Sequence, residues 1–277
     1  MTYREAILLG ESILQKVKIV DAKNDAWLLL AMACRIDHTY YYVHMDEEMS
    51  QEQIREYQAL LSKRAERIPL QYIVGEQEFM GLTFSVNEHV LIPRQDTEVL
   101  VEEVMKNLHD GFRILDLCTG SGCILLSLLH YSNDCSGVGA DLSEEALEVA
   151  RKNAEQLGES SALFVQGDLF APVEGKFEII VSNPPYICSD VIPTLMEEVR
   201  EHEPMQALDG GADGLDFYRK IIQGAKEHLC GGGQLFFEIG YDQGEAVQRL
   251  MEQAGYREVE CVQDFAGLDR VVFGTLW

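Results

Sequence analysis

Residues 113–122 read Arg-Ile-Leu-Asp-Leu-Cys-Thr-Gly-Ser-Gly, a short apolar run followed by a loop of small residues. The apolar run predicts a buried strand, and a helix is expected from Ser121 onward. Glycine carries no side chain, so a glycine-rich loop allows its backbone to approach a ligand closely. The pattern therefore predicts a ligand-binding loop that comprises Cys118, Thr119, Gly120, Ser121 and Gly122.

Strand-like and helical segments alternate throughout the chain beyond Asp96. Strands are expected at residues 113–117, 137–141, 163–167, 178–182, 234–239, 258–262 and 270–273. Such alternation implies an α/β fold, in which helices cover a mostly parallel sheet and the ligand lies outside the carboxyl ends of the strands. The last two strands have no long helix between them, so one antiparallel strand is expected at the end of the sheet.

The N-terminal part of the chain carries a different pattern. Apolar residues recur at helical spacing as far as about Ile73, which predicts a small helical bundle. Asp25, and Ser50 with Gln53, are expected to cap two of its helices. Strand-like residues around Met80-Gly81 predict a β-hairpin. We therefore expect a helical domain over 1–74, a hairpin linker over 75–90 and a ligand-binding domain over 91–277.

Composition restricts the classes of partner. The 277 residues include 47 Asp and Glu but only 22 Lys and Arg, and the resulting net charge of −25 repels phosphate backbones. Direct binding to nucleic acid is therefore not expected. The seven cysteines form no CxxC pair and no metal-ligand spacing, which favours free thiols and no metal. The longest apolar run, Ala26 to Cys34, is too short for a bilayer, and the N-terminus carries charge early, so we expect a cytoplasmic protein.

A stiff polar turn, Asn183-Pro184-Pro185-Tyr186, follows the predicted strand that ends at Ser182. Each proline fixes its own φ and lacks an N–H, so the carbonyl groups of the turn stay free to accept hydrogen bonds. Asn183 adds a side-chain acceptor and donor. The simpler alternative is a strand-ending turn with an aromatic cover. The four residues together favour a turn that holds a planar nitrogen.

Two carboxylates follow the next two predicted strands. Asp141, about twenty residues beyond the glycine loop, can accept both hydroxyls of a ribose, although it could also cap the helix expected from Ser143. Asp168 can accept from an adenine amino group while the backbone N–H of Leu169 donates to the ring. A nicotinamide dinucleotide motif would need glycine where Leu125 stands. With Asn183 at the fourth strand end, the constellation predicts an S-adenosylmethionine site.

The chain resembles class I methyltransferases and, within them, the peptide chain release factor glutamine methyltransferases (the PrmC/HemK family). The resemblance covers nearly the whole chain and is carried by residues 69–73, 79–82, 91–94, 96–98, the glycine loop, 183–186, 203–204 and 213–215. Residues 91–94, Leu-Ile-Pro-Arg, and the helical N-terminal part narrow the choice to this family. Two departures are Cys118, where the family usually has glycine, and Gln95, where it usually has proline.

The resemblance implies a Rossmann-like domain with a mostly parallel seven-stranded sheet, joined by a β-hairpin to an N-terminal helical bundle that recognises the substrate. It implies methyl transfer from S-adenosylmethionine, leaving S-adenosylhomocysteine, to the glutamine of the Gly-Gly-Gln loop in class I release factors. A monomer is expected. In our hypothesis the Asn183 side-chain oxygen and the Pro184 carbonyl each accept one N–H of that glutamine, while Pro185 and Tyr186 complete its binding site.

Three alternatives remain from the sequence. The same turn could hold an exocyclic amino group of a flipped adenine or guanine, which a basic groove would normally accompany. A ribosomal-protein glutamine could be the acceptor, or the chain could be a non-catalytic scaffold that only binds S-adenosylmethionine.

Arg94 could pair with a cofactor carboxylate, and Glu238, between apolar neighbours, could face the site or form a structural hydrogen bond. Neither of these two residues is assigned a catalytic role.

Overall fold

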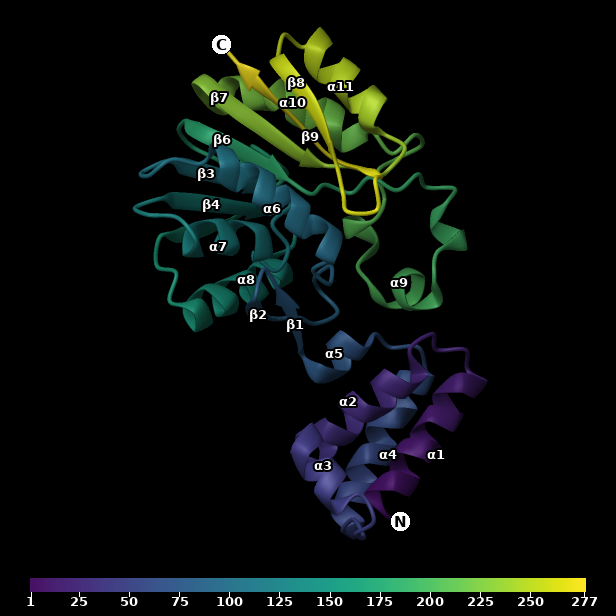
Figure 1. The fold of residues 1–277 in the computed structure, drawn as a ribbon. Coiled ribbons are helices and arrows are strands. Elements are labelled where there is room, and N and C mark those ends of the chain that lie inside the picture. Colours follow the sequence, from purple (N-terminus) through teal and green to yellow (C-terminus); the bar gives the residue numbers. More distant parts are fainter. The chain divides into compact units, whose positions relative to one another are not determined.

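The computed structural model describes residues 1–277, which form two compact units (Figure 1). The smaller unit comprises Met1–Gly75 together with Met196–His202, and the larger unit comprises Glu76–Leu195 and Glu203–Trp277. The chain therefore leaves the larger unit once, adds a short helix to the smaller unit, and returns.

The smaller unit is a helical bundle, as expected. Its helices are α1 (Tyr3–Lys16), α2 (Ala22–Cys34), α3 (His38–His44), α4 (Gln51–Ala65), α5 (Leu70–Val74) and, from the returning segment, α9 (Glu197–His202). Leu14, Leu29, Leu30 and Leu61 are fully buried between α1, α2 and α4. Tyr57 is buried with them, and its hydroxyl donates to the Ala26 carbonyl at 3.2 Å.

One of the two expected caps is confirmed and the other is wrong. Ser50 and Gln53 form a reciprocal capping box at the start of α4. Asp25 lies inside α2 and is buried, with its carboxylate 2.7 Å from Nε of Arg64. Arg64 also contacts Glu198 of α9 at 3.2 Å. A buried guanidinium needs a counter-charge. The ion pair with Arg64, which is distant in sequence, therefore explains the position of Asp25 better than helix capping does.

The larger unit contains a seven-stranded sheet with the strand order β5-β4-β3-β6-β7-β9-β8. The strands are β3 (Arg113–Leu117), β4 (Ser136–Asp141), β5 (Ala162–Gln166), β6 (Phe177–Ser182), β7 (Leu229–Glu238), β8 (Arg257–Gln263) and β9 (Asp269–Leu276). All neighbouring pairs are parallel except those that β9 makes with β7 and β8. The single antiparallel strand was expected, but it lies inside the sheet, because β9 inserts between β7 and the edge strand β8.

Helices cover both faces of this sheet (Figure 1). α6 (Gln95–Asn107) and α7 (Cys123–His130) share one apolar core with Ile114, Val181 and Phe236, and α8 (Glu144–Leu157) packs against α7. α10 (Asp216–His228) and α11 (Gly244–Gln253) share the other with Leu115 and Phe237. Two 3₁₀ turns, η1 (Ile192–Thr194) and η2 (Met205–Ala207), lie in the segment between β6 and α10.

The hairpin of β1 (Glu76–Phe79) and β2 (Leu82–Ser85) belongs to the larger unit. Phe79 and Phe84 are buried in the core that contains α6 and α7. Asn153 of α8 binds the backbone of Ser85 through both its donor and its acceptor, at 3.1 and 2.7 Å. The hairpin is thus held to this unit by apolar and polar contacts alike.

The strand register aligns the loops that carry the candidate site. Leu117 pairs with Ala140 on one side and with Ser182 on the other, and Ser182 pairs with Phe237. The residues after β3, β4, β6 and β7 therefore emerge at one edge of the sheet.

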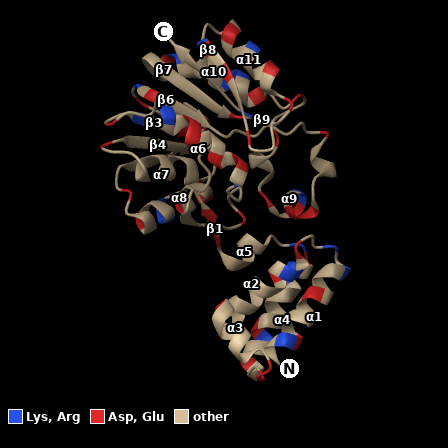
Figure 2. Cartoon of the chain, viewed as in Figure 1, with Lys and Arg blue, Asp and Glu red and all other residues tan.

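None of the helices combines the length and hydrophobicity that a membrane-spanning helix requires. Acidic residues are spread over both units (Figure 2).

Candidate active site

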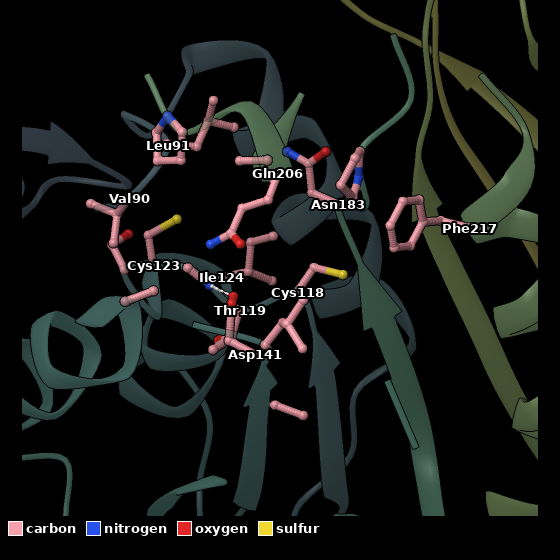
Figure 3. A pocket seen from close by; sticks show the side chains of 18 of the residues that line it. Val90, Leu91, Cys118, Thr119, Cys123, Ile124, Asp141, Asn183, Gln206 and Phe217 are labelled. Carbon is pink, nitrogen blue, oxygen red and sulfur yellow. Dashed lines mark hydrogen bonds between the residues drawn. The ribbon is translucent and has the colours of Figure 1, made fainter. Parts of the chain in front are cut away.

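A cavity of about 370 Å³ opens at the carboxyl edge of the sheet, within the larger unit (Figure 3). Residues from the loops after β3, β4, β5 and β6 line it, together with the start of α6 and the segment around η2. Of the residues predicted for the site, the cavity is lined by Cys118, Thr119, Gly120, Ser121, Asp141, Asp168, Leu169, Asn183 and Pro185. Gly122, Pro184 and Tyr186 are not among its lining residues.

The glycine loop turns sharply between β3 and α7. Cys118, Gly120 and Gly122 have φ angles of 60°, 55° and 78°. At Cys118 the positive φ suits the glycine that the family usually has, and a residue with a Cβ costs about 1–2 kcal/mol there. Burial raises the pKa of the Cys118 thiol, which is therefore neutral. A Cβ on Gly120 would meet no atom within 4 Å, so space over the backbone stays open.

Asp116, at the end of β3, supports this loop from below. It is fully buried, and its Oδ2 accepts a hydrogen bond of 2.6 Å from the Thr119 hydroxyl. Burial raises the pKa of the Asp116 carboxyl to about 7. The carboxyl therefore anchors Thr119, while its second oxygen has no hydrogen-bond partner.

Asp141 joins the glycine loop to the following strand end. Its Oδ2 accepts from the Gly120 backbone N–H at 2.9 Å, and its Oδ1 accepts from the Ser143 backbone N–H at 3.0 Å. Ser143, not Asp141, caps α8, because its hydroxyl accepts from the backbone N–H of Ala146. Burial raises the pKa of the Asp141 carboxyl, and hydrogen bonds from backbone N–H groups lower it in part. Each oxygen keeps a lone pair with which to accept a ligand hydroxyl.

The Asn-Pro-Pro-Tyr turn faces the cavity with only part of its surface. Asn183 lies in the wall near Phe217 and Gln206 (Figure 3). Its Nδ2 is 3.4 Å from Oγ1 of Thr97, so its side-chain oxygen is left for the cavity. Pro184 is buried, and its carbonyl accepts no hydrogen bond within the chain. Tyr186 packs into the core beside α10 and α11.

Glu238 lies beneath this turn, at the end of β7. Its side chain is almost completely buried, and its Oε1 is 3.4 Å from the Tyr186 hydroxyl. Burial raises the pKa of the Glu238 carboxyl to about 7, although the Thr97 hydroxyl and the Arg270 guanidinium lower it in part. Arg270 itself forms ion pairs with Asp264 at 3.0 Å and Asp96 at 3.2 Å. Glu238 therefore forms a structural hydrogen bond and does not line the cavity.

Several lining residues were not predicted from the sequence. They include Thr97, Gln206, Phe217, Lys220, Cys123, Ile124 and residues 89–91. Thr97 and residues 91–94 lie within motifs that carry the family resemblance. Membership of these motifs was the signal by which the sequence could have indicated a role in the site. Arg94 also lines the cavity and forms an ion pair with Glu203, whose side chain is buried. This ion pair explains how Arg94 is held at the cavity, but it does not show which ligand group Arg94 would bind.

The cavity suits S-adenosylmethionine in size and in chemistry. Its volume lies in the range typical of small-ligand sites. The open space over Gly120 admits a ligand close to the backbone, and the buried hydroxyl of Ser121 has no partner within the chain. Two carboxylates in its wall, Asp141 and Asp168, can accept hydrogen bonds from hydroxyl and amino groups.

The larger unit is similar to known methyltransferases. Residues 94–200 match the family described as "Methyltransferase small domain". A solved methyltransferase from Pyrococcus furiosus has the same fold, with a TM-score of 0.54 and 19% identity over 80% of this chain and 98% of its own. The fold and the site thus define a class I, S-adenosylmethionine-dependent methyltransferase.

Further findings concern first the N-terminal part of the chain and then its full length. Residues 5–75 match the family described as "PrmC N-terminal domain". The release factor glutamine methyltransferase of Geobacter sulfurreducens is 41% identical over 99% of this chain and 97% of its own length. That of Caulobacter vibrioides is 44% identical over 99% of this chain and 96% of its own. The chain belongs to the release factor glutamine methyltransferase family.

Proposed function

We propose that this protein transfers a methyl group from S-adenosylmethionine to the side-chain amide nitrogen of the glutamine in the Gly-Gly-Gln loop of class I peptide chain release factors. One observation carries the proposal: Asn183 and the glycine loop line the same cavity. A methyl donor bound at the loop would therefore lie beside an amide bound at the turn. Full-length similarity to relatives of that name supports the choice of substrate.

For this methyl transfer the protein mainly has to orient the acceptor amide relative to the methyl donor. The lone pair of an amide nitrogen is delocalised into the carbonyl, so this nitrogen is a weak nucleophile. S-adenosylmethionine supplies an electrophilic methyl group on a positively charged sulfur. The Asn183 side-chain oxygen and the free Pro184 carbonyl each accept one N–H of the glutamine and turn its nitrogen toward the donor. The S–CH₃ bond breaks as the N–CH₃ bond forms, S-adenosylhomocysteine leaves, and the methylated nitrogen then gives up one proton to water. Correct placement of two reactants can lower a barrier by about 7–11 kcal/mol, so no strong base is required.

The other predicted residues bind the cofactor or complete the substrate site. In our proposal Cys118, Thr119, Gly120, Ser121 and Gly122 form the loop under the methionine and ribose portions. Asp141 accepts the ribose hydroxyls, and Asp168 with the Leu169 backbone N–H recognises the adenine. Pro185 shapes the wall of the cavity. Tyr186 supports the turn from the core, and its contact with Glu238 favours this supporting role.

We further propose a division of labour along the chain. Residues 1–74 recognise the release factor, residues 75–90 link the two parts, and residues 91–277 carry out methyl transfer. An excess of 25 acidic charges suits a protein partner better than a nucleic acid. We propose a cytoplasmic monomer that does not bind nucleic acid directly.

The test is mass spectrometry of a purified class I release factor after incubation with the enzyme and isotope-labelled S-adenosylmethionine. We expect one labelled methyl group on the glutamine of the Gly-Gly-Gln loop. A release factor with alanine in place of that glutamine should stay unlabelled. Label on ribosomal proteins or nucleic acid instead, or cofactor binding without any transfer, would refute the proposal.

A further inference from the structure

The turn between β8 and β9 carries the most exposed large apolar side chain of the protein. Phe265 is 98% exposed, and Leu268 in the same turn is 44% exposed. Single apolar residues are common on protein surfaces, so exposure alone does not indicate a function. The position of this turn and the contacts that hold it set Phe265 apart from such residues.

The turn lies at the carboxyl edge of the sheet, where the candidate active site opens. β9 runs antiparallel to β7, and Val271 near its start pairs with Glu238 at the end of β7. The backbone N–H of Ile239, which follows β7, donates to the Arg270 carbonyl at 2.9 Å. In Figure 1 the yellow turn extends beyond the arrowhead of β7. Residues 264–268 therefore project from the same edge as the loops that line the cavity.

Asp264 holds the turn in one shape. Its Oδ1 accepts hydrogen bonds from the backbone N–H groups of Ala266 and Leu268, at 2.9 and 3.0 Å. Its own backbone N–H donates to the Leu268 carbonyl at 2.8 Å. Gly267 has a φ of 79°, a conformation that glycine adopts without steric cost. Because these hydrogen bonds fix the backbone, the turn keeps the Phe265 side chain in solvent.

A buried arginine ties the turn to the wall of the cavity. Arg270 is 8% exposed, donates to Oδ2 of Asp264 at 3.0 Å and forms an ion pair with Asp96 of α6 at 3.2 Å. Arg94 and Thr97, on either side of Asp96 in sequence, line the cavity. Since a buried guanidinium depends on its counter-charges, this pairing fixes the turn relative to the start of α6.

The composition of the turn restricts what it can bind. Residues 265–268 read Phe-Ala-Gly-Leu and carry no charge. The charges nearest to them, on Asp264 and Arg270, are paired with each other. A phosphate backbone would find no free cation here. An exposed aromatic side chain is instead a typical anchor in a contact between proteins.

We propose that Phe265 and Leu268 form a docking surface for the class I release factor, in addition to the recognition proposed for residues 1–74. The acceptor glutamine belongs to a folded protein, which is much larger than a cavity of about 370 Å³. While that glutamine reaches Asn183, the body of the release factor covers the carboxyl edge of the sheet. Phe265 then packs on an apolar patch beside the Gly-Gly-Gln loop. The inference rests on the proposed function, because it names a surface that holds the same substrate.

The first test compares Phe265→Ser with Phe265→Leu in steady-state methylation of a purified class I release factor. Serine removes the apolar surface, whereas leucine keeps much of it. We expect Phe265→Ser to raise the KM for the release factor about tenfold or more, with kcat and the Kd for S-adenosylmethionine close to wild type. The KM of Phe265→Leu should stay within a few-fold of wild type. Trp277→Ser, a matched loss of an exposed aromatic side chain just beyond the other end of β9, should leave the KM unchanged.

The second test detects the contact without turnover. The photoreactive amino acid p-benzoylphenylalanine replaces Phe265 in one variant and Trp277 in another, and each is irradiated with release factor and S-adenosylhomocysteine. We expect position 265 to crosslink to the release factor near its Gly-Gly-Gln loop, as located by mass spectrometry, and position 277 not to crosslink to it.

The possible failures can be told apart. If the wild-type enzyme methylates the release factor, an unchanged KM in Phe265→Ser overturns the inference alone. Crosslinks from position 265 only to a second copy of the enzyme, or to nothing, overturn it in the same way. A wild-type enzyme that methylates no release factor refutes the proposed function and this inference together.

Discussion

Gly210 lies directly against the backbone of Tyr186. A Cβ atom on Gly210 would stand 2.7 Å from the Tyr186 Cα and 2.9 Å from the Pro185 carbonyl oxygen. Two backbone hydrogen bonds join the same segments, from Ile187 to the Leu208 carbonyl at 3.0 Å and from Gly210 to the Ile187 carbonyl at 2.8 Å. A segment that follows the Asn-Pro-Pro-Tyr turn in sequence therefore supports it from behind.

Gly210→Ala should displace the turn, because the new methyl group meets backbone atoms that cannot move aside alone. We expect kcat for the release factor to fall at least about tenfold, since a small misplacement of reacting groups is costly. Steady-state kinetics measure this. Gly231→Ala is the matched control, because a Cβ at Gly231 meets nothing within 4 Å. Equal kcat values for the two variants would show that the support is unimportant.

Asn183→Ala removes the side-chain oxygen proposed to accept from the glutamine amide. Removing one orienting group of this kind costs about a hundredfold or more in kcat. The Kd for S-adenosylmethionine, measured by calorimetry, should change only a few-fold. Losses of similar size in both quantities would place Asn183 in cofactor binding and not in substrate orientation.

Asp141→Asn should weaken cofactor binding more than turnover. Each oxygen of the Asp141 carboxylate already accepts a hydrogen bond from a backbone N–H group. The asparagine amide has only one oxygen, so it can replace only one of these two acceptors. Because hydrogen bonds to charged groups contribute about 1.5–3 kcal/mol, we expect the Kd for S-adenosylmethionine to rise about tenfold to a hundredfold. At saturating cofactor kcat should recover much of its value. An unchanged Kd would exclude Asp141 from the binding site.

The pH dependence of kcat should report on Glu238. The groups around it are Thr97 and Asp96 of α6, Arg270 of β9 and Tyr186. Its pKa, raised to about 7 by burial, means that the carboxyl is ionised above that pH and protonated below it. A protonated carboxyl is no longer attracted to the Arg270 guanidinium and can donate a hydrogen bond, so the support beneath the turn changes. We expect kcat to fall as the pH decreases through about 7.

Glu238→Gln is the control for this pH dependence, because glutamine does not titrate. The variant should have a lower kcat that no longer varies with pH near 7. The profile is measured with saturating cofactor and release factor. If the variant keeps the same fall in kcat below pH 7, another group is responsible.

Arg64→Met should destabilise the smaller unit. Arg64 contacts Asp25 at 2.7 Å and Glu198 at 3.2 Å with its side chain buried. Its loss leaves the buried Asp25 carboxylate without a counter-charge, whereas Glu198 keeps its ion pair with Arg67 at 2.7 Å. Breaking a buried pair in this way costs about 3–5 kcal/mol. The chain has two tryptophans, and in a Trp277→Phe background the fluorescence of Trp27 follows the unfolding of this unit alone. Arg4→Met, which breaks an exposed pair with Asp46, should have little effect.

Much of the fold could be predicted because its signals are local. The apolar run before the glycine loop, the alternation of strands and helices, and the Ser50 and Gln53 capping box each depend on residues close together in sequence. The rule that parallel strands gather their ligand site at the carboxyl edge then placed Asn183, Asp141 and the loop around one cavity.

The errors concern contacts between distant segments. Aspartate often caps helices, which is why Asp25 was predicted as a cap, but its partner is Arg64, 39 residues away. The last two strands lie near each other in sequence, yet nothing local indicates that β9 enters between β7 and β8. Strand order depends on which apolar faces are covered together, and several segments decide it jointly.

By itself, the sequence determined the class of fold, the cofactor loop and the residues of the turn, because these depend on backbone preferences and on hydrophobic periodicity along a short stretch. Only the tertiary structure decided what stands behind the turn. Thr97 reaches Asn183 across 86 residues, and Glu238 comes beside it through the pairing of β6 with β7. Such contacts exist only once the strands have taken their order and α6 has packed on the sheet, since hydrogen bonds act over a few ångströms in space whatever the separation along the chain.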